Sequence, residues 1–364
     1  MRLARRVRFS RSLRHRAAAV GAAGLLLVTA ASCSPVDEPD HGPPSTVERA
    51  VGRVTADESA TLLADLAAPR SHLRDMLREL GSDPGPERVR ALRRAEFALA
   101  LQADGPLNGL AEYGPGTRVA YAVSLGGRDV LATKSADGRV YLRLRLAALA
   151  DAGVLTAAQR ARVDDVTALA GQLPDSLAAA ARFLRGRWVA VDGDDFAEYG
   201  WALEEFTGVS VSQRRLRGAA ALTDGSDLRA ALGALRDVLV EHTTYRRAGD
   251  RHGADEPGEQ RLRVDLPARR TADALAPLLE RVDAGIVPER VPRHRVPGVL
   301  TVRRGTLAEL RVDLGRLTGT AARVPLRLRF ATGDVFSPNP PRHSVALAPQ
   351  DLLAAALYAR VHRP

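Results

Sequence analysis

The sequence predicts an α+β protein in which roughly eight to eleven antiparallel strands form one sheet, with helices inserted between two groups of strands. Three observations support this fold class. Apolar and polar residues alternate over about 95–146 and again over about 259–330, which is the periodicity of half-buried strands. The intervening segment Ala147–Arg185 places its apolar residues at helical spacing. Asp137-Gly138 separates two alternating runs, and this dipeptide is the strongest short-range hairpin signal.

Residues 1–32 have the layout of an export signal. Seven arginines and no acidic residue occupy positions 1–16, and an apolar or small run follows from Ala17 to Ala31. This run is shorter than the roughly 20 residues that a permanent membrane span needs. We therefore expect the signal to be removed, which lowers the formal net charge from +10 to +3.

Cys33, the only cysteine in the chain, directly follows this run. The small residues at 30–32 match the bacterial lipobox, in which the cysteine is acylated and becomes the new N-terminus, although Ala30 stands where leucine is usual. The alternatives are a plain secretory signal with a chance cysteine, or a buried thiol. Because the Pro- and Asp-rich stretch 34–45 cannot bury enough apolar surface to fold, we expect a lipidated Cys33 and a flexible tether over 33–56. A single domain then occupies 57–364, at the outer face of the cell membrane.

The apolar residues between Asp57 and Gly81 recur at helical spacing, and Pro69 divides them into two predicted short helices. The segment 95–102 favours a strand, although its alanines and leucines would allow a helix. An antiparallel meander then extends to residue 146. In its last strand we expect an inner face of Val140, Leu142, Leu144 and Leu146, and an outer face of Tyr141, Arg143 and Arg145.

The rest of the chain continues this alternation of element types. Helices are expected at about 195–206, 227–242, 269–282 and 351–361. Strands are expected at about 186–192, 259–266, 298–303, 307–314 and 323–330, with one turn at Arg304-Gly305.

The sequence holds no pattern that predicts catalysis or a metal centre. The metalloprotease, nucleophile-elbow, P-loop and dinucleotide motifs are missing, and a lone cysteine excludes a Cys/His zinc site in the mature chain. The acidic segment Asp192–Glu205 fails as a calcium loop, because Ala197 and Leu203 stand where Gly and Glu are needed. We therefore expect no enzyme activity, no metal and no cofactor.

The basic residues do not predict nucleic-acid binding. Of the 53 basic residues only Lys134 is a lysine, and no basic patch is rich in aromatic residues. The arginines of 214–217 and the pair Arg246-Arg247 could contact anionic headgroups, or could form an ordinary solvated face.

Several of these segments resemble the LolA-like half-barrel lipoproteins, including the actinobacterial LppX/LprG type. The likeness rests on the strand Asp137–Leu144, the helices after it, the strand Arg185–Asp192, and the late strands Thr301–Leu314 and Pro325–Phe330. The strand 185–192 resembles the family's G-K-W-V-x-V-D strand, with arginine in place of lysine. The insertions around 194–258 are longer than a minimal half-barrel needs. The resemblance covers about 90–340. It implies a strongly curved sheet, wrapped around helices, that encloses an apolar cavity for acyl chains and has no catalytic residues.

This resemblance implies that the protein binds or carries lipid. An envelope sensor or adaptor that binds a partner protein without lipid transport is the alternative, and an envelope enzyme ranks last. The expected partners are the membrane, through the anchor, and a lipid; no nucleic acid is expected. The residues expected to line the cavity are Val119, Tyr121, Val123, Val140, Leu142, Leu144, Leu262, Val264, Val312, Leu314, Leu326 and Leu328.

Overall fold

The fold is known from a computed structural model. It describes residues 43–107 without 82 and 84, 116–195 without 154, 198–202, 234, 237–247, 258–273, 291–332 without 292, and 336–362. The signal peptide, Cys33, the arginines of 214–217 and most of the helices expected near 203, 230 and 278 lie outside these residues.

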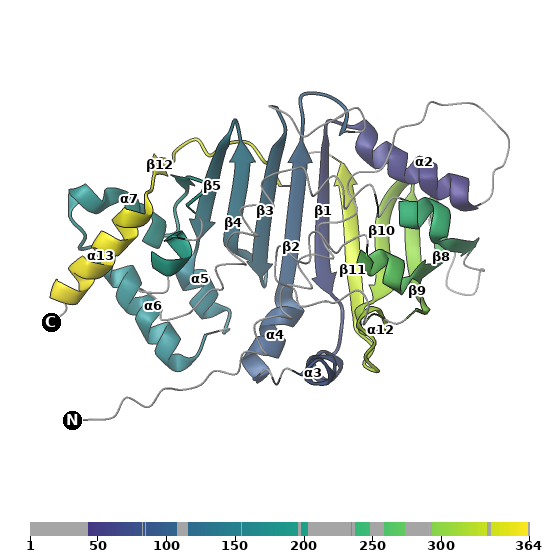
Figure 1. The fold of residues 1–364 in the computed structure, drawn as a ribbon, viewed down its shortest axis with the longest axis horizontal. Helices are drawn as coiled ribbons and strands as arrows, with labels where there is room; N and C mark the ends of the chain where they lie inside the picture. The colour runs from purple at the N-terminus through teal and green to yellow at the C-terminus, as the bar shows by residue number, and fades with distance from the viewer. Residues whose placement is uncertain are drawn as a thin grey trace.

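The described residues form one open sheet of twelve strands (Figure 1). The strands are β1 (Ser59–Leu66), β2 (Ala95–Gln102), β3 (Arg118–Leu125), β4 (Arg128–Ala136), β5 (Arg139–Leu144), β6 (Val189–Val191), β7 (Thr244–Arg247), β8 (Glu259–Pro267), β9 (Arg295–Arg303), β10 (Thr306–Asp313), β11 (Pro325–Thr332) and β12 (Val345–Ala346). Their spatial order is β12-β6-β5-β4-β3-β2-β1-β11-β10-β9-β8-β7, antiparallel throughout except for the parallel pair β12 and β6. The α+β class is confirmed. The sheet is one strand larger than the expected maximum and is not purely antiparallel.

The labelled helices precede, interrupt and follow these strands. They are α2 (Pro43–Ala56), α3 (Arg70–Glu79), α4 (Pro86–Arg94), α5 (Leu146–Asp151), α6 (Ala157–Leu169), the 3-10 helix η3 (Asp175–Leu177), α7 (Ala178–Leu184), α12 (Leu314–Thr318) and α13 (Pro349–His362). Residues 198–202, 237–242 and 268–273 are also helical. No helix within the described part of the chain is both long and apolar enough to cross a bilayer.

The cross-strand register divides the sheet into two faces. Leu62 pairs with Leu99 and Leu99 with Tyr121, so these three side chains share one face, which we call the inner face. Asp65 pairs with Glu96 and with Arg327 on the opposite, outer face. The inner face is apolar along almost every strand, whereas the outer face carries charged and small side chains.

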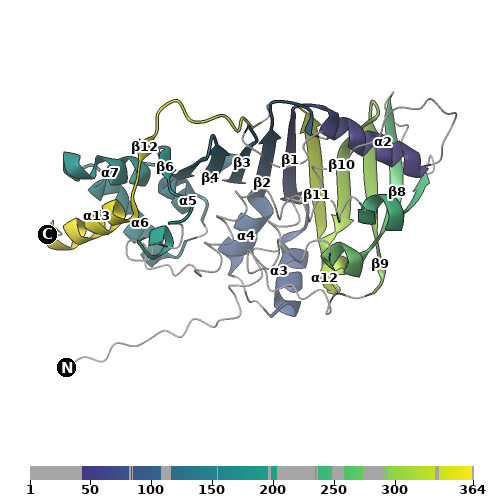
Figure 2. The ribbon, with the colours of Figure 1, turned by 45° about the horizontal axis from the view of Figure 1, so that its top comes forward.

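Two large hydrophobic clusters cover most of the inner face, and a small third one, of Ala268, Ala272, Val291 and Val296, lies at the start of β9. The α2 cluster joins α2, α3 and α4 to strands β1, β2 and β8–β11, and its fully buried members include Leu62, Leu73, Leu101, Leu262, Leu300 and Leu326. The α7 cluster joins α5, α6, α7 and α13 to β5 and β6 around Phe183 and Leu184. Figures 1 and 2 show α5, α6, α7 and α13 at one end of the sheet, α2 toward the other end, and α3 and α4 below the middle strands β1 and β2.

The prediction of two helices over 57–81 was half wrong. Residues 70–79 are helical, but residues 59–66 form β1, in the middle of the sheet between β2 and β11. The spacing of the leucines at 62, 63 and 66 fits a helix, and residues 62 and 66 also fit one face of a strand. Pairing with both neighbouring strands decides for the strand, because Leu62 lies opposite Leu99 on one side and Phe330 on the other. Helix α4 and the strands β7 and β12 were not expected.

The flexible tether predicted over 33–56 was wrong for its second half, because α2 begins at Pro43. Val47, Val51 and Val54 recur at helical spacing and are at most 4% exposed, in the α2 cluster. The helix contacts β10, and Arg53 Nη1 donates a hydrogen bond to the carbonyl of Arg304 at 3.1 Å. The folded domain therefore starts earlier than expected.

A segment after β11 leads from the centre of the sheet to its edge. Asn339 anchors it, because its side-chain oxygen accepts a hydrogen bond from Arg118 Nη1 at 3.3 Å and its carbonyl accepts one from Lys134 Nζ at 2.9 Å. Figure 2 shows this segment passing along the top of β3 and β4 to β12. The closing helix expected at 351–361 follows it as α13.

Candidate functional site

The residues expected to line a cavity lie on the inner face, but most of them are packed core. Val119, Leu262, Val264, Val312, Leu314, Leu326 and Leu328 belong to the α2 cluster, and Val140 and Leu142 to the α7 cluster. None of these nine side chains is more than 8% exposed. Leu314 begins α12 directly after β10. Side chains of the protein's own helices therefore cover these positions.

The other three expected residues, Tyr121, Val123 and Leu144, are half-buried. Leu144 packs against the α7 cluster, as does Leu131 opposite it. Tyr121 and Val123 belong to neither cluster of the described residues, nor does Leu125 at the end of β3.

A strip of half-buried side chains therefore runs between the two clusters. It consists of Tyr121, Val123 and Leu125 on β3 and of Leu131 and Thr133 on β4, and we call it the central strip. Tyr121 pairs directly with Thr133, and Val123 with Leu131. Sequence reasoning missed Leu131 and Thr133, although pairing across the predicted β3–β4 hairpin would have placed them beside the residues it named.

The strip has the dimensions of an extended apolar chain. Two adjacent strands make it roughly 10 Å wide, and the four-residue rise from Tyr121 to Leu125 makes it about 13 Å long. Its polar groups are two hydroxyls, those of Tyr121 and Thr133. Burial raises the pKa of the Tyr121 phenol, so this side chain is neutral at physiological pH. The strip offers apolar surface with no charge.

Hydrogen bonds on the outer face hold the strands of the strip in register. Ser124 Oγ donates to Asp129 Oδ1 at 2.9 Å, where the β3–β4 ladder shifts by one residue. Arg143 Nη2 donates to the other oxygen of Asp129 at 2.7 Å and so ties β5 to β4. Arg143 also lies 4.6 Å from the centre of the Trp188 ring, which extends the connection to the chain entering β6.

No protein-family model matches the chain, and no curated protein matches it. The LolA-like resemblance therefore stays a prediction.

The described residues offer no metal centre. Nowhere among them do three or more His, Cys, Asp or Glu side chains gather in a group that could hold a metal ion. In the acidic segment the N–H of Asp194 donates to Asp192 Oδ1 at 3.0 Å, a local turn contact. Arg246 is exposed on β7, 3.8 Å from Asp265.

Proposed function

We propose that the chain is an envelope lipoprotein, anchored by acyl chains on Cys33, that binds lipid without catalysing a reaction. In this proposal the sheet curves as a half-barrel, and an acyl chain lies on the central strip. The observation that carries the proposal is the gap between the two clusters. Tyr121 and Val123 face the same side as the core strands and yet, among the described residues, belong to neither hydrophobic cluster.

An apolar chain on the strip would be held by burial. Apolar surface removed from water contributes about 25 cal/mol per Å², so about 200 Å² of contact is worth roughly 5 kcal/mol before the cost of association. This favours a reversible carrier over a permanent store. The neutral hydroxyls of Tyr121 and Thr133 could orient an ester group without a charge having to be desolvated.

The early start of α2 limits how far the domain can lie from an anchor at Cys33. Nine residues separate Cys33 from Pro43, and ten links of extended chain reach at most about 35 Å. The domain would therefore stay close to the membrane surface from which it takes lipid. The intact mass of the denatured protein tests the anchor: Cys33→Ser should remove the added acyl mass and the membrane association together.

Native mass spectrometry of the full chain, isolated from the membrane of the cells that produce it, tests the lipid-binding proposal. We expect one non-covalent acyl-chain ligand per protein, in addition to the covalent anchor. A chain that carries none, and that takes up no phospholipid added to it, would contradict the proposal.

One observation favours a second candidate, an envelope adaptor that binds a partner protein. Nine of the twelve expected lining residues are filled in by the protein's own helices. On that hypothesis the inner face is closed to lipid along most of its length. Crosslinking in intact cells from residue 123 distinguishes the two functions, because an adaptor gives a protein adduct there and a lipid carrier gives a lipid adduct.

A further inference from the structure

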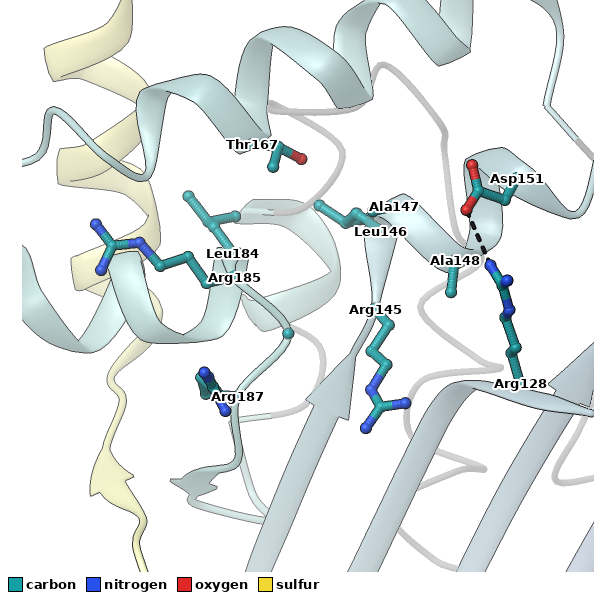
Figure 3. A pocket seen from close by; sticks show the side chains of 11 residues that line it. Arg128, Arg145, Leu146, Ala147, Ala148, Asp151, Thr167, Leu184, Arg185 and Arg187 are labelled. Atoms are coloured by element: carbon teal, nitrogen blue, oxygen red, sulfur yellow. Dashed lines mark hydrogen bonds and ion pairs between the residues drawn. The ribbon is translucent and has the colours of Figure 1, made fainter.

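A hollow of about 450 Å³ lies where β5 ends, between the start of β4, the helices α5 and α6, and the turn after α7 (Figure 3). Among the described residues, four arginines line it, Arg128, Arg145, Arg185 and Arg187, and one carboxylate, that of Asp151. Its formal charge is therefore +3. The site adjoins the end of the central strip, because Arg128 pairs with Leu125, but the two share no residue.

Backbone geometry places the turn that carries Arg187 against Arg145. The N–H groups of Gly186 and Arg187 donate to the carbonyls of Phe183 and Arg182, at 2.8 and 3.0 Å, which is the Schellman closure of α7. Gly186 takes a φ of +72°, and a Cβ there would lie 3.1 Å from Arg145 Cγ. The absence of a side chain at Gly186 thus lets the turn touch Arg145. In Figure 3 the side chains of Arg145 and Arg187 both extend below this turn.

The arginines of the hollow differ in what they bind. Arg128 Nη1 pairs with Asp151 at 3.2 Å, and Arg185 Nη2 donates to the carbonyl of Ala170 at 2.7 Å. Within the described residues Arg145 and Arg187 make no side-chain hydrogen bond or ion pair. These two guanidinium groups therefore present all their donors to the hollow and to solvent.

Several arginines of the sheet are paired with carboxylates, in contrast to Arg145 and Arg187. On the outer face, Arg327 and Arg329 pair with Asp65, Arg303 pairs with Glu259, and Arg311 pairs with Glu309. At the hollow, neither Arg145 nor Arg187 forms an ion pair with a carboxylate among the residues described.

We propose that the hollow binds a phosphate-type dianion through Arg145 and Arg187, with Arg128 adding to the positive field. Guanidinium forks match the paired oxygens of a phosphate, and such charge-assisted hydrogen bonds are roughly twice as strong as neutral ones. The volume exceeds that of a bare phosphate ion and leaves room for a substituent. The phosphate can belong to a free small molecule or to a lipid headgroup. The site does not depend on acyl-chain binding at the central strip.

Calorimetric titration of the full chain at low salt, with inorganic phosphate in one arm and dihexanoyl phosphatidic acid in the other, tests the site. Binding of inorganic phosphate identifies a free-phosphate site, and binding of the phosphatidic acid alone identifies a headgroup site. In either case Arg145→Gln with Arg187→Gln should weaken binding at least about tenfold, which corresponds to about 1.4 kcal/mol. Arg160→Gln, an exposed arginine of α6 outside the hollow, is the matched control and should change nothing.

A gain of affinity provides a second test that misfolding cannot imitate. Asp151→Asn removes the only carboxylate of the hollow and releases Arg128, so phosphate binding should tighten several-fold. The proposal is overturned if neither probe binds at about 10 mM, or if the double arginine variant binds as the wild type does. Uptake of a neutral diacylglycerol, measured on the same variants, reports on the central strip separately and should be unaffected by them.

Discussion

Tyr121 and Thr133 lie directly opposite each other on β3 and β4, and both face the gap between the two hydrophobic clusters. The same strands turn Ala120, Ala122 and Ala132 to the outer face, where all three are at most 2% exposed. On these two strands the outer-face alanines are thus buried, whereas the inner-face residues of the central strip are half-buried. This arrangement is opposite to that of β1 and β11, whose inner-face leucines are the buried ones.

A charge in the strip should abolish lipid binding without unfolding the protein. Val123→Glu places a carboxylate on a half-buried position outside both clusters, where an acyl chain would have to desolvate it. We expect bound lipid, measured by native mass spectrometry, to fall at least tenfold. Arg139→Glu at the exposed start of β5 is the control. Equal occupancy in the Val123 variant and the wild type would place the lipid elsewhere.

The residues of the inner face should differ in how much they contribute to the free energy of unfolding. Leu262 is fully buried in the α2 cluster, so Leu262→Ala should lower the free energy of unfolding by about 2–5 kcal/mol. Val123→Ala, at the half-buried strip, should cost less than about 1 kcal/mol. Urea denaturation followed by circular dichroism measures both. Similar losses at the two sites would mean that the strip is packed as tightly as the core.

Helix α2 should behave as part of the domain. A chain that starts at residue 57 lacks Val47, Val51 and Val54 and exposes the surface of β10 that α2 covers, so we expect it to aggregate or to unfold at lower urea. Within the full chain, Val51→Ala should cost about 2 kcal/mol. Glu48→Ala, on the exposed side of the same helix, should cost little. A stable, monomeric chain from residue 57 would restore the tether prediction.

Acid should selectively weaken the ion pairs at the start of β8. Arg303 Nη2 and Arg261 Nε donate to the Glu259 carboxylate at 2.9 and 2.8 Å, and these bonds hold the pKa of Glu259 below its ordinary value of 4.5. A carboxyl with a lowered pKa stabilises the fold above its unfolded value, and that stability is lost as the pH falls through the folded-state pKa. The wild type should therefore exceed Glu259→Gln in unfolding free energy at pH 7, and the difference should shrink below about pH 4.5. A difference that does not vary with pH would contradict this assignment.

The strands and turns of the meander followed from local sequence. Asp137 and Gly138 have φ values of 54° and 70°, and Arg304 and Gly305 have 51° and 76°, so both predicted turns put two successive residues in the left-handed region. Side chains beside each turn alternate between the two faces as predicted, but burial does not follow this alternation in β5, where Tyr141 of the outer face is only 6% exposed. The helices of 147–185 and the closing helix α13 also followed from local sequence.

The position of β1, the docking of α2 and the location of the central strip required the tertiary structure. β1 is a strand because it pairs with β11, which follows it by some 260 residues, and local spacing cannot show such a pairing. Similarly, Val123 and Val264 occur in strands with the same alternation of apolar with polar or small residues. One lies in the gap and the other in the α2 cluster, because the described helices, which are far away in the sequence, pack on only part of the sheet. The sequence alone determined which side chains share a face, and only the packing of distant elements decided which part of that face is left uncovered by the cores.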